Sequence, residues 1–303
     1  MTIEIFSWIA FNIFVLLMLY IDLRIFHRES HAIGHREAFI SSAVWIILAL
    51  LFCLGLYFVS GTEPALSFLA GFLLEKSLSV DNLFVFLMIF TYFAIPKKYL
   101  HKILFWGVLG ALVMRAVFIF SGVILIQKFE WMIYLLGALL IYTGIKLALH
   151  NGVEVDIEKN FVLRLFRKFF PITDNYNDDA FFIKKSGKYF ATPLFVVLLL
   201  IETTDILFAI DSVPAILSIT KDPFIVYTSN VFAILGLRSL YFALESSMQL
   251  FKYLNYGLAI LLVFVGIKML LSHVFPIPVS VVLITIASVL SISIAASVVL
   301  TRN

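Results

Sequence analysis

The residues most able to do chemistry in this chain of 303 residues are five carboxylates inside long apolar stretches. The segment EKSLSVDNLFVF carries Glu75 and Asp81, and the segment IETTDILFAIDSVPAI carries Glu202, Asp205 and Asp211. At the centre of a membrane helix an unpaired acid costs about 2.5 to 3.5 kcal/mol, so five cost roughly 12 to 18 kcal/mol, comparable with the stability of a whole domain. These acids must therefore be paired, protonated or bound to an ion.

The ligand chemistry around these acids favours a hard cation. Carboxylate, amide, hydroxyl and carbonyl oxygens suit Mg²⁺, Ca²⁺ or Mn²⁺, whereas Zn²⁺ and Cu⁺ require nitrogen or sulfur ligands, and no histidine or cysteine lies among these residues. Three basic residues are predicted at the same depth in the membrane: Lys76, Arg115 and Arg238. If all eight groups ionise, the net charge is −2, which a single divalent cation would neutralise.

Two uses of these charges stay open at the level of sequence. The acids and arginines either form fixed interhelical ion pairs, such as Arg115 with Glu75 and Arg238 with Asp205, or they line a substrate path in which the arginines act as gates. Lys76 is either a built-in cation that fills the empty site or a salt-bridge partner. Three neutral residues serve either as ligands or as helix–helix hydrogen-bonding groups: Asn82, Ser212 and Asn230.

Helix geometry restricts how these acids can meet. Six residues advance a helix by 600°, which leaves Asp81 about 120° away from Glu75 and about 9 Å along the axis. Asp205 and Asp211 have the same spacing. Because Pro214 cannot donate to the helical ladder, we expect a break at residues 211–214 and, by analogy, a second one at 79–82.

The elements that must position these residues are membrane helices. With 62% hydrophobic and 14% charged residues the chain is not a soluble globular protein. Its continuous apolar runs favour helices over a β-barrel, and we read the first run as a retained helix rather than a signal peptide. We therefore predict an all-α, multi-pass fold with nine spans: 5–26, 39–60, 65–93, 102–126, 131–150, 191–219, 224–249, 253–273 and 278–300.

The distribution of basic residues orients the spans. Of the 22 lysines and arginines, fifteen fall in loops on one side and two on the other. By the positive-inside rule the N-terminus lies outside and the C-terminus in the cytoplasm, as in a protein of the plasma (inner) membrane. A net charge of +3 gives no indication of a nucleic-acid partner, and the lone Cys53 rules out a dithiol mechanism. Motifs of hydrolases and nucleotide-binding enzymes are absent, so we expect no enzyme.

An internal repeat relates the two acidic segments. Glu75, Asp81 and Asn82 align with Asp205, Asp211 and Ser212 at an offset of 130. In the following spans Arg115 aligns with Arg238, and Gly144 and Lys146 align with Gly266 and Lys268 at an offset of 122. Three spans is an odd number, so the second copy must enter the membrane in the opposite sense. Such an inverted repeat is typical of secondary transporters, which bind substrate near the midplane between the halves.

The repeat divides the chain into five parts. Helices 1 and 2 occupy 5–60, repeat one 65–150, a cytoplasmic linker 151–190, repeat two 191–273 and the last helix 278–300. The linker is basic and amphipathic. The two lysines near span ends, Lys146 and Lys268, are expected to extend to the membrane surface.

The quoted acidic segments, together with FFPITD, DPFIVYTSNVFAILGLRSLYF and DLRIFHRESHAIGHREAF, closely resemble the TerC/Alx family of integral membrane proteins. That resemblance implies membership of the LysE transporter superfamily, export of manganese and, by name, tellurium resistance. The acidic motif residues of the family then map to seven positions here, as candidate metal ligands: Glu75, Asp81, Asn82, Glu202, Asp205, Asp211 and Ser212.

We therefore expect an alternating-access exporter of a divalent cation, Mn²⁺ first and Ca²⁺ or Mg²⁺ as alternatives, with no permanent cofactor. Lys76, Arg115 and Arg238 would supply gates or counter-charges. Rival hypotheses are a membrane partner that delivers metal to secreted proteins, docking on the secretion machinery through 151–190, a tellurium-resistance or stress protein without transport of its own, and a carrier of an organic solute. Nothing redox-active supports tellurite chemistry in these residues.

Overall fold

The computed structural model describes residues 2–26, 35–149, 161–173, 180–185, 187–244 and 254–301. Within this part the chain forms eleven helices and one short hairpin. The bounds are α1 Thr2–Phe26, α2 His35–Ser60, α3 Thr62–Tyr92, α4 Lys97–Lys128, α5 Met132–Leu149, α6 Phe161–Phe169, β1 Phe182–Lys185, β2 Lys188–Ala191, α7 Pro193–Leu217, α8 Pro223–Leu235, α9 Leu237–Leu244, α10 Leu254–Leu271 and α11 Val279–Thr301.

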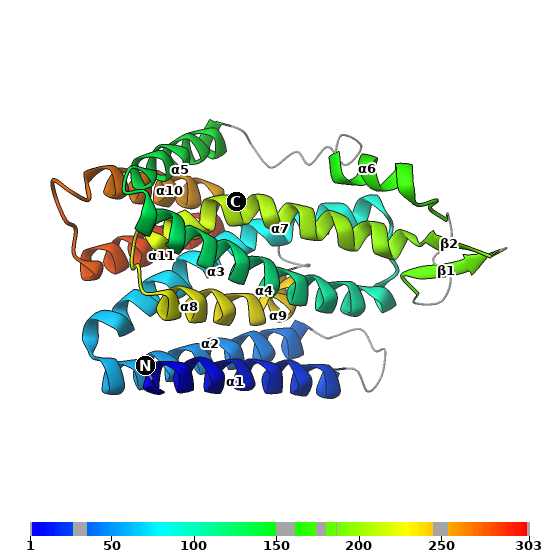
Figure 1. The fold of residues 1–303 in the computed structure, drawn as a ribbon, viewed down its shortest axis with the longest axis horizontal. Coiled ribbons are helices and arrows are strands. Elements are labelled where there is room, and N and C mark those ends of the chain that lie inside the picture. Colours follow the sequence, from blue (N-terminus) through cyan, green and yellow to red (C-terminus); the bar gives the residue numbers. More distant parts are fainter. Residues whose placement is uncertain are drawn as a thin grey trace.

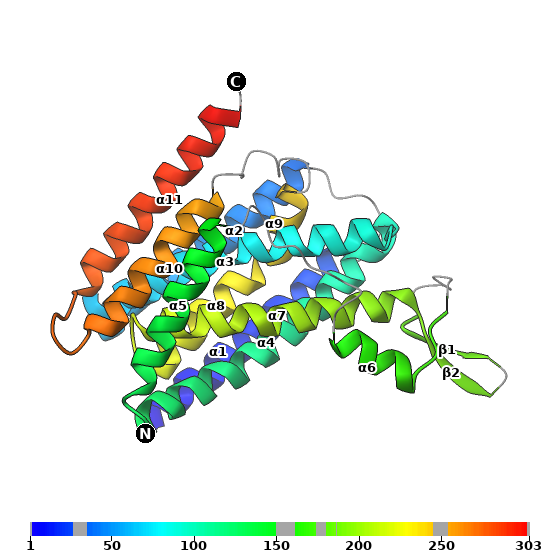
Figure 2. The ribbon, with the colours of Figure 1, turned by 90° about the horizontal axis from the view of Figure 1, so that it is seen from above.

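The long helices form one bundle with α3 near its centre. α3 packs against α2, α7, α8 and α11, and α4 packs against α7 and α8. In Figure 1, α1 and α2 lie on one side of the bundle and α5 with α10 on the other. α6 and the β1–β2 hairpin project from one end, as Figure 2 also shows, and we call this the hairpin end.

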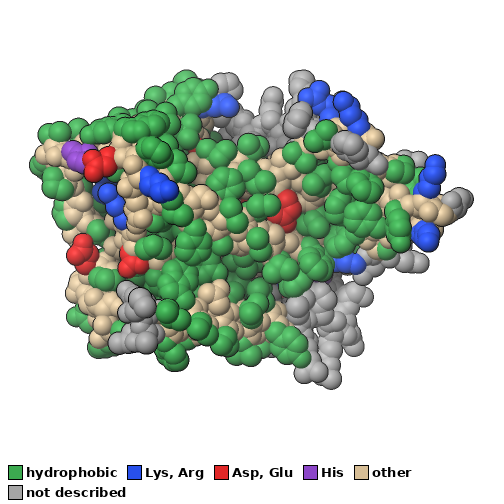
Figure 3. All heavy atoms as spheres, viewed as in Figure 1, with side chains coloured by type: hydrophobic (Ala, Val, Ile, Leu, Met, Phe, Trp, Pro, Cys, Tyr) green, Lys and Arg blue, Asp and Glu red, His purple; other side chains and the backbone are tan. Residues whose placement is uncertain are grey.

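The predicted all-α membrane fold is confirmed. Hydrophobic side chains cover most of the outer face seen in Figure 3. Among the described residues, seven helical stretches are long and apolar enough to cross a membrane, and one of these runs through α8 and α9. Of the other two predicted spans, α1 offers a shorter apolar stretch, Ile5–Ile21, and α3 carries Glu75, Lys76 and Asp81 within seven residues. The count of nine spans stays a prediction.

The predicted helix breaks are wrong. α3 is continuous from Thr62 to Tyr92, because no glycine or proline follows Glu75 to interrupt its ladder. α7 also continues through Pro214, which lies in its last turn, so that the missing N–H affects only the end of a helix that stops at Leu217.

A break does occur in the predicted span 224–249, which is split at Gly236 into α8 and α9. Gly236 lies where two side chains approach the backbone closely. A Cβ atom at this position would stand 2.7 Å from Lys76 Nζ and 3.2 Å from Trp45 Cβ. A larger residue at this position would require Lys76 and Trp45 to shift.

α5 and α10 pack against each other through glycines. A Cβ at Gly266 would meet the carbonyl oxygen of Gly137 at 2.6 Å, and a Cβ at Gly144 would meet that of Ala259 at 2.8 Å. At the offset of 122, Gly144 corresponds to Gly266 and Gly137 corresponds to Ala259, so the two contacts are equivalent. A two-fold axis between antiparallel helices requires this equivalence. The pairing of α3 with α8 matches that of α7 with α4 in the same way. The complete inverted repeat stays a prediction.

The predicted linker 151–190 contains structure of its own. β1 and β2 pair antiparallel, with Lys184 opposite Tyr189 and Lys185 opposite Lys188. The base of this hairpin is tied to the start of α7, because Thr192 Oγ1 donates to the carbonyl of Ala180 at 2.7 Å. The amphipathic helix α6 packs on α7.

Candidate metal site

A buried ion pair lies where α3 meets α4. Arg115 Nη1 stands 2.5 Å from Glu75 Oε1, and the two side chains are 3% and 0% exposed. Arg115 occupies the middle of α4, and Glu75 lies near the middle of α3. This is the ion pair that the fixed-pair alternative named for these two residues.

The same guanidinium group reaches the second half of the chain. Arg115 Nη1 donates to Ser212 Oγ at 2.7 Å and to Asn230 Oδ1 at 3.0 Å. Asn230 is held in turn, since its Nδ2 donates to the carbonyl of Val226 at 2.9 Å. Arg115 therefore joins α3, α4, α7 and α8 through polar contacts in an otherwise apolar interior.

Asp205 completes this group. Its side chain is 5% exposed and lies within Coulombic range of both Arg115 and Glu75. The alternative in which Asp205 pairs with Arg238 is thus replaced by an association with Arg115. We call Glu75, Arg115, Asp205, Ser212 and Asn230 the Arg115 cluster.

One oxygen of the cluster lacks a partner. Glu75 Oε1 is held by the ion pair, whose angle does not satisfy a hydrogen bond, and Glu75 Oε2 accepts no hydrogen bond at all. Buried polar atoms in folded proteins nearly always have partners, so each exception calls for an explanation. A cation at Oε2 would supply one, and the oxygen-only donor set of the cluster suits a hard ion.

Asp211 lies apart from this cluster. It accepts a hydrogen bond from Thr143 Oγ1 of α5 at 3.0 Å, and Lys146 acts on it electrostatically. Because α7 is unbroken, Asp211 points about 120° away from Asp205, as the spacing of six residues demands. Thr143 was not foreseen from the sequence, since no charge or motif marks it.

Asp81, Asn82 and Glu202 also lie outside the Arg115 cluster. Asp81 and Asn82 are buried on α3, with exposed fractions of 8% and 3%. The carboxyl group of Glu202 packs against Gly110 of α4, where a Cβ would overlap it. Glu202 Oε2 is buried and accepts no hydrogen bond.

The seven predicted ligands therefore do not converge on one point. Among the described residues, no three His, Cys, Asp or Glu side chains stand close enough together to hold a metal ion. Only Glu75, Asp205 and Ser212 belong to the Arg115 cluster. The remaining predicted ligands, Asp81, Asn82, Glu202 and Asp211, are distributed along α3 and α7.

Two lysines, Lys76 and Lys268, donate hydrogen bonds to carbonyl groups at helix ends. Lys76 Nζ donates to the carbonyl of Ala233 at 3.2 Å, in the last turn of α8, where a cation opposes the helix dipole. Lys268 Nζ donates to the carbonyl of Ser218, the C-cap of α7, and its extension to the membrane surface stays a prediction. Arg238 is the second residue of α9 and is 5% exposed.

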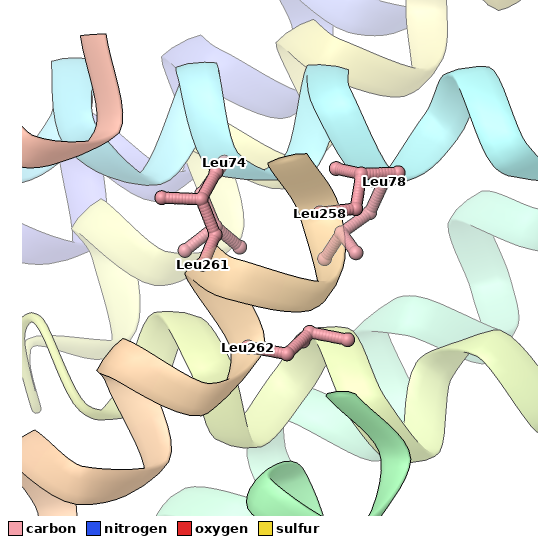
Figure 4. A pocket seen from close by; sticks show the side chains of 5 residues that line it. All are labelled: Leu74, Leu78, Leu258, Leu261 and Leu262. Carbon is pink, nitrogen blue, oxygen red and sulfur yellow. The ribbon is translucent and has the colours of Figure 1, made fainter. Parts of the chain in front are cut away.

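A small cavity lies beside the cluster without belonging to it. Figure 4 shows its lining on α3 and α10. All five lining side chains are leucines, which offer a cation no ligand: Leu74, Leu78, Leu258, Leu261 and Leu262. This cavity is therefore no candidate for an ion site.

Comparison with known proteins adds the following. Residues 60–303 match the family model described as integral membrane protein TerC family. An uncharacterized membrane protein, STKORF319, from Myxococcus xanthus is 48% identical over 98% of this chain and 93% of its own. A putative membrane-bound redox modulator, Alx, from Escherichia coli (strain K12) is 45% identical over 90% of this chain and 88% of its own. No solved structure matches the chain.

Proposed function

The chain belongs to the TerC family of integral membrane proteins, and from this premise we propose that it moves a divalent metal cation out of the cell. Mn²⁺ is the first candidate, with Ca²⁺ and Mg²⁺ as alternatives. The proposal includes a location in the inner membrane, with the N-terminus outside and the C-terminus and the hairpin end in the cytoplasm. The positive-inside count of loop residues supports this orientation.

The observation that carries the proposal is the Arg115 cluster. Glu75 and Asp205 come from equivalent positions of the two repeats and both lie close to one guanidinium group. Charged groups this deep inside a membrane protein cost free energy, and such groups usually mark a substrate path. Carboxylate, hydroxyl and amide oxygens from two halves would bind a hard cation between them.

Arg115 has a defined part in this mechanism. In the state that the structure describes, its positive charge stands against Glu75 Oε1. A divalent ion that binds Glu75 and Asp205 must take over this role, so Arg115 would release Glu75 while it keeps its hydrogen bonds to Ser212 and Asn230. When the ion leaves, Arg115 returns and keeps the carboxylates compensated. The remaining predicted ligands, Asp81, Asn82, Glu202 and Asp211, would line the route to and from the cluster.

Transport by the purified protein tests the proposal. We expect proteoliposomes that contain the wild-type protein to pass Mn²⁺, and those with Asp205→Asn to lose at least ten-fold in rate, since a buried carboxylate ligand is replaced by a neutral amide. Glu63→Gln is the matched control, because Glu63 is an exposed acid in the first turn of α3. Absence of wild-type flux, or equal rates for the two variants, would contradict metal transport through this cluster.

A second candidate rests on the hairpin end. Three exposed lysines, Lys184, Lys185 and Lys188, gather on the β1–β2 hairpin beyond the bundle. A docking surface of this kind suits a membrane partner that hands metal to proteins of the secretion machinery. Replacing the three lysines by glutamine should then leave Mn²⁺ flux in proteoliposomes intact while metal loading of secreted proteins in cells falls. Unchanged loading would count against this role.

The name of some relatives, redox modulator, does not change the proposed function. The lone cysteine, Cys53, donates from its Sγ to the carbonyl of Ala65 at 3.3 Å within the packing of α2 on α3. One thiol in such a position cannot cycle between dithiol and disulfide. A stress or tellurium phenotype would then follow from altered metal levels rather than from electron transfer by this chain.

A further inference from the structure

Three buried polar side chains lie in a row on α3. Glu75, Ser79 and Asn82 occupy positions i, i+4 and i+7 of a continuous helix, which places them within about 60° of one another over about 10 Å. They are 0%, 0% and 3% exposed. Asp81, by contrast, points about 120° away from Glu75 and is not part of the row.

Each member of this row has an oxygen without a hydrogen-bond partner. These atoms are Glu75 Oε2, Ser79 Oγ and Asn82 Oδ1. Serine hydroxyls inside helices usually donate to a carbonyl one turn back, and Ser77 on the same helix does so, with its Oγ 2.5 Å from the carbonyl oxygen of Leu73. Ser79 thus departs from the behaviour of its neighbour, although both side chains are buried.

The row is a property of α3 alone. At the offset of 130, the positions on α7 that match Glu75, Ser79 and Asn82 are Asp205, Ala209 and Ser212. Ala209 offers no oxygen, and Ser212 Oγ is already bound by Arg115. Unsatisfied buried oxygens are costly, and three in one line would be selected against unless a ligand meets them.

We infer that Glu75 Oε2, Ser79 Oγ and Asn82 Oδ1 form an oxygen track along α3, on which a partly dehydrated divalent cation moves between the hairpin end and the Arg115 cluster. The inference rests on the proposed function and adds Ser79 as a ligand on the route. From Glu75 the row advances toward the C-terminal end of α3, which lies toward the hairpin end in Figure 2. Two neutral oxygens hold an ion more weakly than carboxylates do, which lets it pass on to Glu75.

Ser79→Ala is the direct test, with Ser77→Ala as the matched control. Both changes remove one buried hydroxyl from α3, and only one removes an oxygen of the track. In proteoliposomes we expect Ser79→Ala to raise the KM for Mn²⁺ about ten-fold, the effect of losing one buried contact to a charged group, and Ser77→Ala to leave the KM within about two-fold. Equal KM values for the two variants would overturn the track while wild-type flux upholds the proposed function. No wild-type flux would overturn both.

A gain of ligand strength gives an independent readout. In a Cys53→Ala background, Ser79→Cys places a thiol on the track, and thiolates bind Zn²⁺ far better than hydroxyls do. We expect micromolar Zn²⁺ to block Mn²⁺ flux through Ser79→Cys, with Ser77→Cys and the Cys53→Ala parent at least ten-fold less sensitive. Equal sensitivity of the two cysteine variants would overturn the position of Ser79 on the ion route.

Discussion

Arg115 and Arg238 stand at matching positions of the two predicted repeats, yet their surroundings differ. Arg115 lies in the middle of the continuous helix α4 and crosses to Ser212 on the acidic helix of the other half. Arg238 lies at the start of α9, just after a break. The matching acceptor for Arg238 would be Asn82, whose Oδ1 accepts no hydrogen bond. The contact from Arg115 to Ser212 therefore has no counterpart between Arg238 and Asn82 Oδ1.

A few residues explain this difference between the halves. Gly236 corresponds to Val113 in α4, so the second half has a glycine where Lys76 and Trp45 approach the backbone and the first half has a β-branched residue. Lys76, which stabilises the end of α8, corresponds to Ile206 on α7. The two predicted repeats thus differ in conformation. The proposed alternating-access mechanism expects such a difference, since exchanging the conformations of the halves would open the other side.

Among the changes that test this difference between the halves, removing the charge of Glu75 should have the largest effect on stability. Glu75→Gln leaves Arg115 buried without its counter-charge, which costs about 3 to 5 kcal/mol in the free energy of unfolding. Thermal unfolding in detergent micelles measures this loss. The double variant with Arg115→Met should recover most of the stability and none of the Mn²⁺ flux. Recovery of flux in the double variant would show that the pair only holds the fold together.

Adding a methyl group between α5 and α10 should have the next largest effect. Gly266→Ala drives a Cβ into the backbone of Gly137, and Gly144→Ala does the same against Ala259, so each should lower the stability by about 1 to 3 kcal/mol. Equal losses are expected if a two-fold axis relates the contacts. Gly55→Ala in α2 is the control, because nothing stands within 4 Å of its Cβ position, and it should be neutral or slightly stabilising. Losses that differ strongly would argue against the two-fold relation.

The smallest effect concerns one hydroxyl in each half. Ser212→Ala removes an acceptor of Arg115 and should lower the free energy of unfolding by about 1 to 2 kcal/mol. Ser79→Ala removes an oxygen that has no partner, so stability should stay level or rise. Midpoints of thermal unfolding, compared in one detergent, give the sign of each change. A loss for Ser79→Ala as large as that for Ser212→Ala would mean that Ser79 has a structural bond.

The composition, the periodic spacing of residues and the motifs were enough to predict the fold class and the family of this protein. Apolar runs indicated the helical membrane fold, because backbone groups in lipid must bond within their own segment. The depth of Glu75 and Arg115 indicated that their charges need compensation, and their ion pair was one of two alternatives that the sequence left open. The family followed from motifs that a single chain already contains.

Only the tertiary structure decided which acids lie together and which lie apart. The sequence placed seven ligands on two helices, but an unbroken helix turns residues six apart to different neighbours, so Asp211 meets Thr143 while Asp205 meets Arg115. The break at Gly236 and the carbonyl groups bound by Lys76 and Lys268 likewise depend on which helix ends come together. Those contacts join residues far apart in the chain, and local propensity carries no information about them.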